Sequence, residues 1–362
     1  MKGLVVMENK LYEIIRNFDV EVSISPYGNG HINDTYISES NPRYILQRIN
    51  NSVFKNPEQV MENILNITEF LRKKVIETGG DPERETLNVV KTIDGETLYK
   101  TEDGEYYRMY KFIEDSRSYD TPESPEMLYQ AARAFGRFQK LLSDYPADSL
   151  FETIKDFHDT RKRFENLRKA VEADKCGRCK LVEKEIEFAF ARENEVGIIV
   201  DAIADGSVPL RVTHNDTKLN NVMLDENTGE GVCVIDLDTV MPGSLLYDYG
   251  DALRFGASSG AEDEQELDKI WFDLEMFEAF TKGFLEEVGD SLTDTERKLL
   301  AFSAKIITYE CGIRFLTDYL EGDTYFKIHR ENHNLDRCRT QFKLVADMEK
   351  KMDEMNSIVT KY

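Results

Sequence analysis

The stretch of residues 212–221, with the sequence VTHNDTKLNN, contains four side chains at a spacing suited to phosphoryl transfer. They are His214, Asp216, Lys218 and Asn221, and a short apolar run fifteen residues after Asn221 ends at Asp236. In phosphoryl transfer an aspartate accepts the proton of the attacking hydroxyl, and a downstream asparagine and a second aspartate hold magnesium against the nucleotide phosphates. We therefore predict Asp216 as the catalytic base, Lys218 as the cation that neutralises the transferring group, and Asn221 and Asp236 as magnesium ligands.

Short strands on either side of the loop must position these residues. Residues 210–212 and 222–224 have the composition of strands, and the segment 225–229 is rich in turn-forming residues. The strand that follows the turn is expected to place Asp236 beside Asn221. Two oxygen ligands from adjacent strands suit a hard cation such as Mg²⁺, whose other ligands are waters and phosphate oxygens.

Three further polar residues near this loop are expected to support it. We predict that His214 braces the loop backbone by hydrogen bonding. Asp248 is expected to anchor the loop after the metal ligand, and Asp238 is an outside candidate for a third metal contact.

The N-terminal part of the chain reads as a strand meander followed by a helix. Residues 20–25 alternate between apolar and polar side chains, 35–38 and 43–49 continue as strands, and 57–75 form an amphipathic helix that begins at a proline. Further strands are expected near 87–90, 97–100 and 106–112.

The turn between the first two strands contains the glycine loop Gly28-Asn29-Gly30. A dinucleotide-binding loop requires a helix directly after it, whereas β-branched strand follows here. A glycine loop between two strands instead covers nucleotide phosphates with its backbone N–H groups. We therefore expect Gly28, Asn29 and Gly30 to bind nucleotide, although Asn33 occupies the position of the third glycine in that pattern.

The remaining nucleotide contacts are expected from the third strand and from the hinge after the sheet. The strand 106–112 leads out of the sheet, so Tyr110 and Phe112 are expected to lie beside an adenine edge. Kinases carry a phosphate-binding lysine on the third strand, where this chain has Gln47 and Arg48. We expect Gln47 to bind nucleotide, and Arg48 can supply the charge only if it points into the cleft, because adjacent strand residues face opposite sides.

The chain after residue 122 changes to long helical patterns. The predicted helices span 124–143, 159–173, 180–204, 264–288, 293–320 and 335–357, and the only strands expected there flank the catalytic loop. These elements predict an α+β chain with a nucleotide-binding unit at 1–114 and a helical unit at 115–362 that contains the catalytic loop and the acceptor site.

The composition limits the classes of partner. Of 362 residues, 46 are basic and 69 acidic, giving a net charge of −23, which argues against nucleic acid and anionic membranes as partners. No apolar run approaches the length of a membrane-spanning helix. The five cysteines and the absence of a signal-peptide pattern favour reduced thiols and a cytoplasmic location. The oligomeric state is not indicated.

The order of these elements resembles the protein-kinase-like two-lobe fold, and within it the aminoglycoside phosphotransferase and choline kinase-like superfamily. That superfamily has a loop of the form H-x-D and lacks an A-P-E segment, as does this chain. Within this superfamily the sequence resembles the bacterial N-acetylhexosamine 1-kinases more closely still. The strings that carry the similarity are PYGNGHIN (26–33), YILQ (44–47), VTHNDTKLNN (212–221), IDLDT (235–239), MPGS (241–244), RFGAS (254–258) and RFLTDYLEGD (314–323).

The resemblance implies a small N-terminal antiparallel sheet lobe with a helix and a larger, mostly helical C-terminal lobe. It implies ATP- and Mg²⁺-dependent phosphorylation of the anomeric hydroxyl of N-acetylglucosamine or N-acetylgalactosamine, which gives the sugar 1-phosphate. It also implies that Asp216 contacts the hydroxyl at C1, with His31, Phe255, Arg314 and Tyr325 as further sugar contacts. Arg314 has an alternative, an ion pair with Asp318 at helical spacing.

Two alternatives remain open. One is a kinase of another small alcohol, such as an aminoglycoside, choline or homoserine. The other is a catalytically inactive nucleotide-binding regulator, which the missing strand lysine favours and which the intact set of Asp216, Asn221 and Asp236 opposes.

Overall fold

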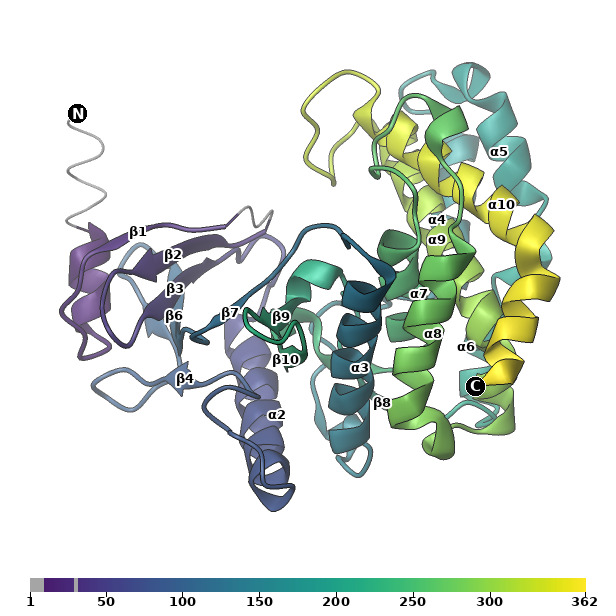
Figure 1. The fold of residues 1–362 in the computed structure, drawn as a ribbon. Coiled ribbons are helices and arrows are strands. Elements are labelled where there is room, and N and C mark those ends of the chain that lie inside the picture. The colour runs from purple at the N-terminus through teal and green to yellow at the C-terminus, as the bar shows by residue number, and fades with distance from the viewer. Residues whose placement is uncertain (1–9, 29–31) are drawn as a thin grey trace.

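The protein folds into a small N-terminal sheet lobe and a larger helical C-terminal lobe. The computed structural model describes residues 10–28 and 32–362. Figure 1 shows the sheet at one side of the molecule, the long helices at the other, and the short strands β9 (Val222–Asp225) and β10 (Gly231–Val234) between them. The predicted α+β class, with an antiparallel N-terminal sheet and a mostly helical C-terminal part, is confirmed.

The N-terminal lobe is built on one antiparallel sheet with the order β1-β2-β3-β6-β4, to which β5 adds by pairing with β6. Its strands are β1 (Ile24–Pro26), β2 (Asp34–Ser38), β3 (Tyr44–Ile49), β4 (Val89–Val90), β5 (Tyr99–Lys100) and β6 (Tyr106–Lys111). Successive side chains of a strand point to opposite faces of the sheet, so residues that pair across neighbouring strands share one face. Thr35, Gln47 and Arg108 are register partners on one face, and Asp34, Arg48 and Tyr107 on the other.

The first strand is shorter than expected, since β1 begins only at Ile24 and residues 20–23 are not in a strand. Val20 is nevertheless buried, in a small core with the helical segment 10–16 and the outer face of the sheet. Alternating polarity in residues 20–25 therefore reflects packing on this core as well as strand pairing.

Helix α2 (Pro57–Glu77) links the two lobes. Its apolar face, with Val60, Ile64 and Ile67 fully buried, belongs to the same hydrophobic core as the helices of the C-terminal lobe. The helix begins at a proline, whose missing N–H costs nothing at a first helical position. The domain boundary at residue 114 remains a prediction.

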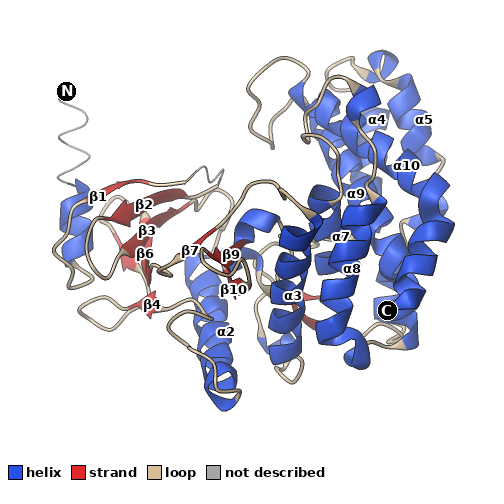
Figure 2. Ribbon diagram, in the orientation of Figure 1, coloured by secondary structure: helices blue, strands red, loops and turns tan. Residues whose placement is uncertain are grey.

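The C-terminal lobe is a set of helices around α9 (Asp294–Glu321), which packs against α4, α7 and α10, while α3 packs against α8. A capping box of Thr293 and Glu296 begins α9. Figure 2 shows how little strand this lobe contains. The other helices are α3 (Pro125–Leu141), α4 (Thr160–Ala173), α5 (Glu183–Phe190), α6 (Ile198–Ala204), α7 (Leu245–Gly256), α8 (Leu274–Val288) and α10 (His333–Lys361).

Helix α7 is absent from the sequence prediction, and its burial explains why. Eleven of its twelve residues are buried, and its polar residues Asp248, Asp251 and Arg254, although at helical spacing, face the protein interior instead of solvent. Gly250 at its centre faces α9 so closely that an added Cβ would lie 2.6 Å from the carbonyl oxygen of Ser303. Glycine has a low helix propensity, so Gly250 indicates a break in the helix when only the sequence is considered.

Two predicted helices are too long. The segment 180–204 divides into α5 and α6, which are separated by turns and by the 3₁₀ turn Glu193–Glu195. At Gly197, just before α6, an added side chain would collide with Arg161 of α4. The segment 264–288 is helical only from Leu274, and Asp273 caps that helix by accepting hydrogen bonds from the N–H groups of Glu275 and Met276. The acidic residues before it pair with basic side chains instead, as Glu262 does with Arg254.

The C-terminal lobe contains more strand than the two segments that flank the catalytic loop. β8 (Arg211–Thr213) pairs with β11 (Met241–Gly243), and β7 (Ser116–Arg117) joins β9, which pairs with β10. Both β7 and β11 are too short to give a periodic pattern. Among the described residues, no helix combines the length and the apolar character that a membrane crossing requires.

Candidate active site

The catalytic loop lies between β8 and β9 and ends in a single 3₁₀ turn, Leu219–Asn221. Nδ2 of Asn221 donates to the backbone oxygen of Asp216 at 2.8 Å and lies 3.3 Å from its Oδ2. Asn215, just before Asp216, has a positive φ of 63°, a conformation that asparagine tolerates better than most residues. The loop therefore holds Asp216 and Asn221 side by side.

Buried carboxylates of α7 fix the backbone of this loop. Asp248 accepts hydrogen bonds from the N–H groups of His214 at 2.9 Å and Asn215 at 2.7 Å, and Asp251 accepts from the N–H of Thr217 at 3.0 Å. Burial raises the pKa of Asp248 above its ordinary value. The prediction that Asp248 anchors the loop after Asp236 is wrong, because Asp248 anchors the catalytic loop itself.

His214 is fully buried and connects the loop to the next strand end. Its Nε2 lies 2.8 Å from the backbone oxygen of Ile235, and its Nδ1 accepts from the N–H of Asp216 at 3.3 Å. The bracing predicted for His214 is therefore present. It connects Ile235, which precedes Asp236, to Asp216, the predicted base.

A cavity of about 110 Å³ lies between the sheet lobe and this loop. Five of the residues expected to act in phosphoryl transfer line it. The lining consists of Ile32, Asn33, Thr35, Gln47, Phe54, Asp216, Lys218, Asn220, Asn221, Asp236, Asp238 and Thr239. Both lobes thus contribute polar side chains to one space, although Asp216 and Asp236 are twenty residues apart in the chain.

The pKa values of the two carboxylates expected to act in the reaction, Asp216 and Asp236, are shifted in opposite directions. Burial opposes ionisation of Asp216, but Lys218, whose Nζ lies 2.8 Å from Oδ1, lowers its pKa below the ordinary value. Asp236 is accessible from the cavity yet crowded by protein atoms, and this enclosure, with the neighbouring charges of Asp238 and Asp216, raises its pKa to about 6. Asp216 is therefore ionised at neutral pH, whereas the charge of Arg108 only partly offsets the burial of Asp236 and the charges of its neighbouring carboxylates.

The donor set at the cavity fits a hard cation that keeps several other ligands. Oδ1 of Asn221 and both oxygens of Asp236 accept no hydrogen bond from the described residues, so these oxygens remain available. Within residues 10–28 and 32–362, no three His, Cys, Asp or Glu side chains form a closed metal site. Mg²⁺ is commonly bound by one or two protein oxygens, with water and phosphate completing its shell.

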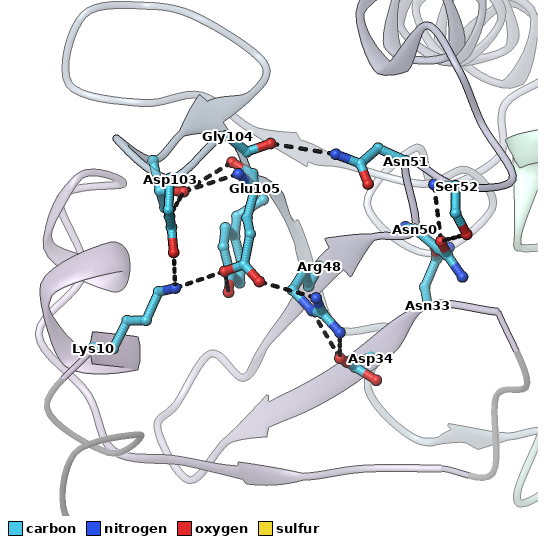
Figure 3. A network of polar contacts seen from close by, with 12 residues as sticks. Lys10, Asn33, Asp34, Arg48, Asn50, Asn51, Ser52, Asp103, Gly104 and Glu105 are labelled. Carbon is cyan, nitrogen blue, oxygen red and sulfur yellow. Dashed lines mark hydrogen bonds and ion pairs between the residues drawn. The ribbon is translucent and has the colours of Figure 1, made fainter.

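Arg48 does not supply charge to the cavity. Figure 3 shows its guanidinium on the outer side of the sheet, paired with Asp34 and, at 3.0 Å, with Glu105, which also accepts from Lys10. This position follows from strand alternation, since Gln47 faces the cavity and its neighbour must face away. In protein kinases the strand lysine pairs with a glutamate of the following helix. The candidate for that position, Glu62 of α2, is exposed and pairs with no strand cation among the described residues.

The glycine loop is described only in part. Asn29, Gly30 and His31, expected to contact phosphate or sugar, lie outside the described residues. Gly28 has a φ of 73°, which favours glycine. Asn33 at the end of the loop donates from Nδ2 to Oδ2 of Asp238 at 2.7 Å and accepts from the N–H of Asn50 at 3.0 Å. The residue in place of a third glycine thus connects the two lobes.

Tyr110 and Phe112 do not line the cavity. Tyr110 is buried in the sheet and stacks against the guanidinium of Arg108 at 5.3 Å. The N–H of Phe112 donates to the backbone oxygen of Arg43 at 2.9 Å, and the Phe112 ring packs edge-on to Tyr27. Their contact with adenine stays a prediction, and the amide of Phe112 already has a protein partner.

The residues expected to contact the acceptor lie at different distances from Asp216. The Phe255 ring lies beside Lys218, whose Nζ is 5.5 Å from the ring centroid. Arg314 lies over the rings of Phe157 and Phe326 and does not line the cavity. The alternative of an Arg314–Asp318 ion pair is wrong, because Asp318 instead accepts from the backbone N–H groups of residues 324–326.

Tyr325 lies next to this region but stands open to solvent. Its side chain is 67% exposed and its ring packs edge-on to Phe326. Its role as a sugar contact stays a prediction.

The sequence prediction does not include Arg108, and it gives Asp238 a different role from the one in the structure. Arg108 is buried beside the cavity, and its Nη1 forms an ion pair with Oδ1 of Asp238. Asp238 is therefore bound by Arg108 and Asn33 in this structure, and its expected role as a third metal contact is not supported. Arg108 could be found from the sequence only by pairing β3 with β6 in register, because nothing in its local sequence marks it.

Comparisons with known proteins agree with this architecture. Among solved structures, a microcompartment-associated aminopropanol kinase has a TM-score of 0.60 at 14% identity, covering 96% of this chain and 98% of its own. An aminoglycoside phosphotransferase from Alicyclobacillus acidocaldarius has a TM-score of 0.60 at 12% identity, covering 96% of each chain. A choline kinase from Cryptosporidium parvum has a TM-score of 0.56 at 14% identity, covering 94% of this chain and 93% of its own.

At this level of identity the three structures show a shared protein-kinase-like fold, which confirms the expected fold class. The family model described as "Phosphotransferase enzyme family" matches residues 23–280, more than half of the chain. This match includes the glycine loop, the catalytic loop and Asp236. The chain belongs to the phosphotransferase enzyme family.

Proposed function

We propose that the protein transfers the γ-phosphoryl group of ATP to the anomeric hydroxyl of an N-acetylhexosamine in the presence of Mg²⁺. The observation that carries the phosphoryl-transfer chemistry is the convergence of Asp216, Asn221 and Asp236 on one cavity shared by the two lobes. The sugar acceptor rests on the resemblance of the sequence and on the charges of the acceptor side.

The proposed reaction is a direct displacement without a covalent enzyme intermediate. Asp216 orients the acceptor hydroxyl and accepts its proton, the hydroxyl oxygen bonds to the γ-phosphorus, and ADP leaves with the electrons of the broken P–O bond. Lys218, 2.8 Å from Asp216, can reach the transferring oxygens and offset their charge. Mg²⁺ held by Asn221 and Asp236 would neutralise phosphate charge.

The described cations near the acceptor side favour a neutral or anionic acceptor over a cationic one. Neither Arg163 nor Arg314 forms a direct ion pair among the described residues. The guanidinium of Arg163 donates to the backbone oxygen of Phe157, and the charge of Glu310 acts on both arginines. Burial, and next the charge of Arg314, lower the pKa of Arg163, so the two guanidinium groups are close enough to repel each other. An ammonium or quaternary amine would add positive charge beside two cations that Glu310 offsets only in part.

A chain of contacts connects these arginines to the catalytic loop. Nε2 of His158 lies 3.3 Å from the backbone oxygen of Asn215, next to Asp216, and its Nδ1 lies 2.9 Å from Glu310. Arg314 is one helical turn after Glu310 and contacts Phe157, the neighbour of His158. Glu310 is occupied by His158 and Thr160, so it offers no open carboxylate to a cationic acceptor.

The proposal is tested by assaying phosphate transfer onto a panel of acceptors. The panel contains N-acetylglucosamine, N-acetylgalactosamine, their unacetylated amines, choline, homoserine and an aminoglycoside. We expect the two N-acetylated sugars to have the highest kcat/KM, because the protonated amines would add positive charge beside Arg163 and Arg314, which Glu310 offsets only in part. Replacing Arg314 by methionine should raise KM for the N-acetylated sugars more than for ATP.

A higher kcat/KM for choline, homoserine or an aminoglycoside would contradict the proposed acceptor while leaving the phosphotransferase assignment intact. A chain that binds nucleotide but transfers phosphate to none of these alcohols would favour the regulator.

The pKa of Asp236 predicts a pH-dependent requirement for Mg²⁺. Its pKa of about 6 in the folded, metal-free chain lies above the ordinary value of 3.8. Ionisation of Asp236 therefore lowers the free energy of unfolding of the metal-free chain, and this loss is complete above about pH 6. Below about pH 6 the proton competes with the metal for the carboxylate. We expect KM for Mg²⁺ to rise about tenfold for each pH unit below 6 and to be nearly constant above 7. A KM for Mg²⁺ that does not change between pH 5 and pH 8 would contradict this prediction.

A further inference from the structure

Arg108 is a buried cation to which the proposed reaction gives no role. It lies on β6, is 1% exposed and does not line the cavity. Its guanidinium is nevertheless fully engaged, because Nε and Nη2 donate to Oε1 of Gln47 at 3.0 and 2.8 Å and Nη1 pairs with Asp238. Nη1 also lies 3.8 Å from the sulfur of Met61 on α2.

The orientation of Arg108 is set by a row of polar residues across three strands. Thr35, Gln47 and Arg108 are register partners on β2, β3 and β6. Nε2 of Gln47 donates to Oγ1 of Thr35 at 3.1 Å, so the oxygen of the same amide must face Arg108. Gln47, which stands on β3 where kinases have a lysine, therefore orients the Arg108 guanidinium of the neighbouring strand β6.

Asp238 receives this cation and is held from a second side. It lies in the 3₁₀ turn Leu237–Thr239, two residues after Asp236. Its Oδ2 accepts from Asn33 at 2.7 Å, and Asn33 in turn accepts from the N–H of Asn50 at the end of β3. Both oxygens of Asp238 are thus bound by residues of the sheet lobe, which fixes the turn that carries Asp236 relative to the sheet.

We propose that Arg108 is a positioning residue which, through Asp238, sets the location of the Asp236 turn against the sheet lobe and so shapes the site for metal-bound triphosphate. The inference rests on the proposed use of Mg²⁺ and ATP and is independent of the acceptor. A buried ion pair contributes little net stability relative to an apolar pair of the same size, because desolvation offsets the attraction. The ion pair joins β6 of the sheet lobe directly to the turn that carries Asp236, and this connection can fix one lobe against the other.

The experiment compares Arg108→Met, the double variant Arg108→Met/Asp238→Asn and the matched control Arg48→Met. Arg48 is on the adjacent strand and also carries an ion pair, but on the outer face of the sheet (Figure 3). For each chain the Kd of the non-hydrolysable analogue AMP-PNP is measured by calorimetry with Mg²⁺ and with EDTA, together with Tm.

We expect Arg108→Met and the double variant to weaken binding of AMP-PNP with Mg²⁺ by about tenfold or more, and to lose most of the difference between Mg²⁺ and EDTA. Arg48→Met should stay within about twofold of the unmodified chain, since exposed ion pairs contribute little. The double variant should recover the Tm lost by the single one, because it leaves no buried charge unpaired, without recovering the effect of Mg²⁺.

A double variant that folds with the Tm of the unmodified chain and keeps its affinity and its response to Mg²⁺ would overturn the proposal. If Arg108→Met does not fold, the double variant and Asn33→Ala, which removes the second tie to Asp238, decide the question by the same readout. Failure of the unmodified chain to bind AMP-PNP with Mg²⁺ would overturn both this proposal and the proposed function, whereas transfer to a different alcohol would affect the latter alone.

Discussion

Replacing Asp216 by asparagine is expected to reduce kcat by about 10²–10⁴-fold, the range contributed by a positioned general base. The carboxamide preserves the size of the side chain and keeps an oxygen near Nδ2 of Asn221, which lies 3.3 Å from Oδ2 in the native loop. It removes the proton acceptor and the ion pair with Lys218. Affinity for ATP with Mg²⁺ should change little, because the predicted metal ligands remain.

The measurement is kcat under saturating substrates alongside the Kd of AMP-PNP. Asp268→Asn, an exposed surface change of the same type, serves as the control and should leave both values unaltered. Near-normal kcat in Asp216→Asn would contradict the assignment of the base. A parallel loss of nucleotide affinity would indicate damage to the loop instead.

Replacing Asp236 by asparagine is expected to abolish most of the effect of Mg²⁺ on nucleotide binding. Loss of one charged metal contact costs roughly 1.5–3 kcal/mol, which corresponds to about 10–100-fold in Kd. Binding in EDTA should be unchanged or stronger, because a negative charge facing the phosphates is gone. The comparison of Kd with and without Mg²⁺ therefore separates a metal ligand from a residue that only repels phosphate.

The metal-free stability of this variant supplies its control. The pKa of Asp236 is raised to about 6, so its ionised form is disfavoured by folding at neutral pH. We expect metal-free Asp236→Asn to have a Tm at pH 8 equal to or above that of the unmodified chain. A lower Tm, or a response to Mg²⁺ equal to that of the unmodified chain, would contradict the role of Asp236.

The parts of the fold that the sequence predicts well are those with a clear period or a defined end. Helix α2 begins at the expected Pro57, and α9 begins within one residue of its expected start, where Thr293 and Glu296 form a capping box. Strands β2 and β3 follow from alternation around the glycine loop. In each case the local signal and the tertiary packing agree.

The failures occur where tertiary packing determines local structure. Helix α7 is almost wholly buried and has a glycine at its centre, and its polar residues face the catalytic loop instead of solvent. Its Asp248 and Asp251 hold the catalytic loop, so the missed helix is also a missed part of the site. The prediction for Asp248 is wrong because the sequence shows only its proximity to Asp236 and not the hydrogen bonds that it accepts from residues 214 and 215.

The candidate site could be predicted where its residues lie in one short motif. Asp216, Lys218 and Asn221 occur within six residues, and Asp236 follows on the next strand, so their proximity depends on one hairpin. Arg108 and Asn33 meet Asp238 across more than one hundred residues of chain. Such contacts are set by sheet register and lobe packing, which a single sequence does not specify.

The most direct test of the account compares the unmodified chain with Asp216→Asn in one reaction that contains ATP labelled at the γ-phosphate, Mg²⁺ and N-acetylglucosamine or N-acetylgalactosamine. The product is identified by ³¹P and ¹H NMR, which distinguish a phosphate at C1 from one at any other hydroxyl. We predict labelled sugar 1-phosphate from the unmodified chain and almost none from Asp216→Asn. Phosphate at a different hydroxyl, no transfer to either sugar, or equal product from both chains would contradict the account.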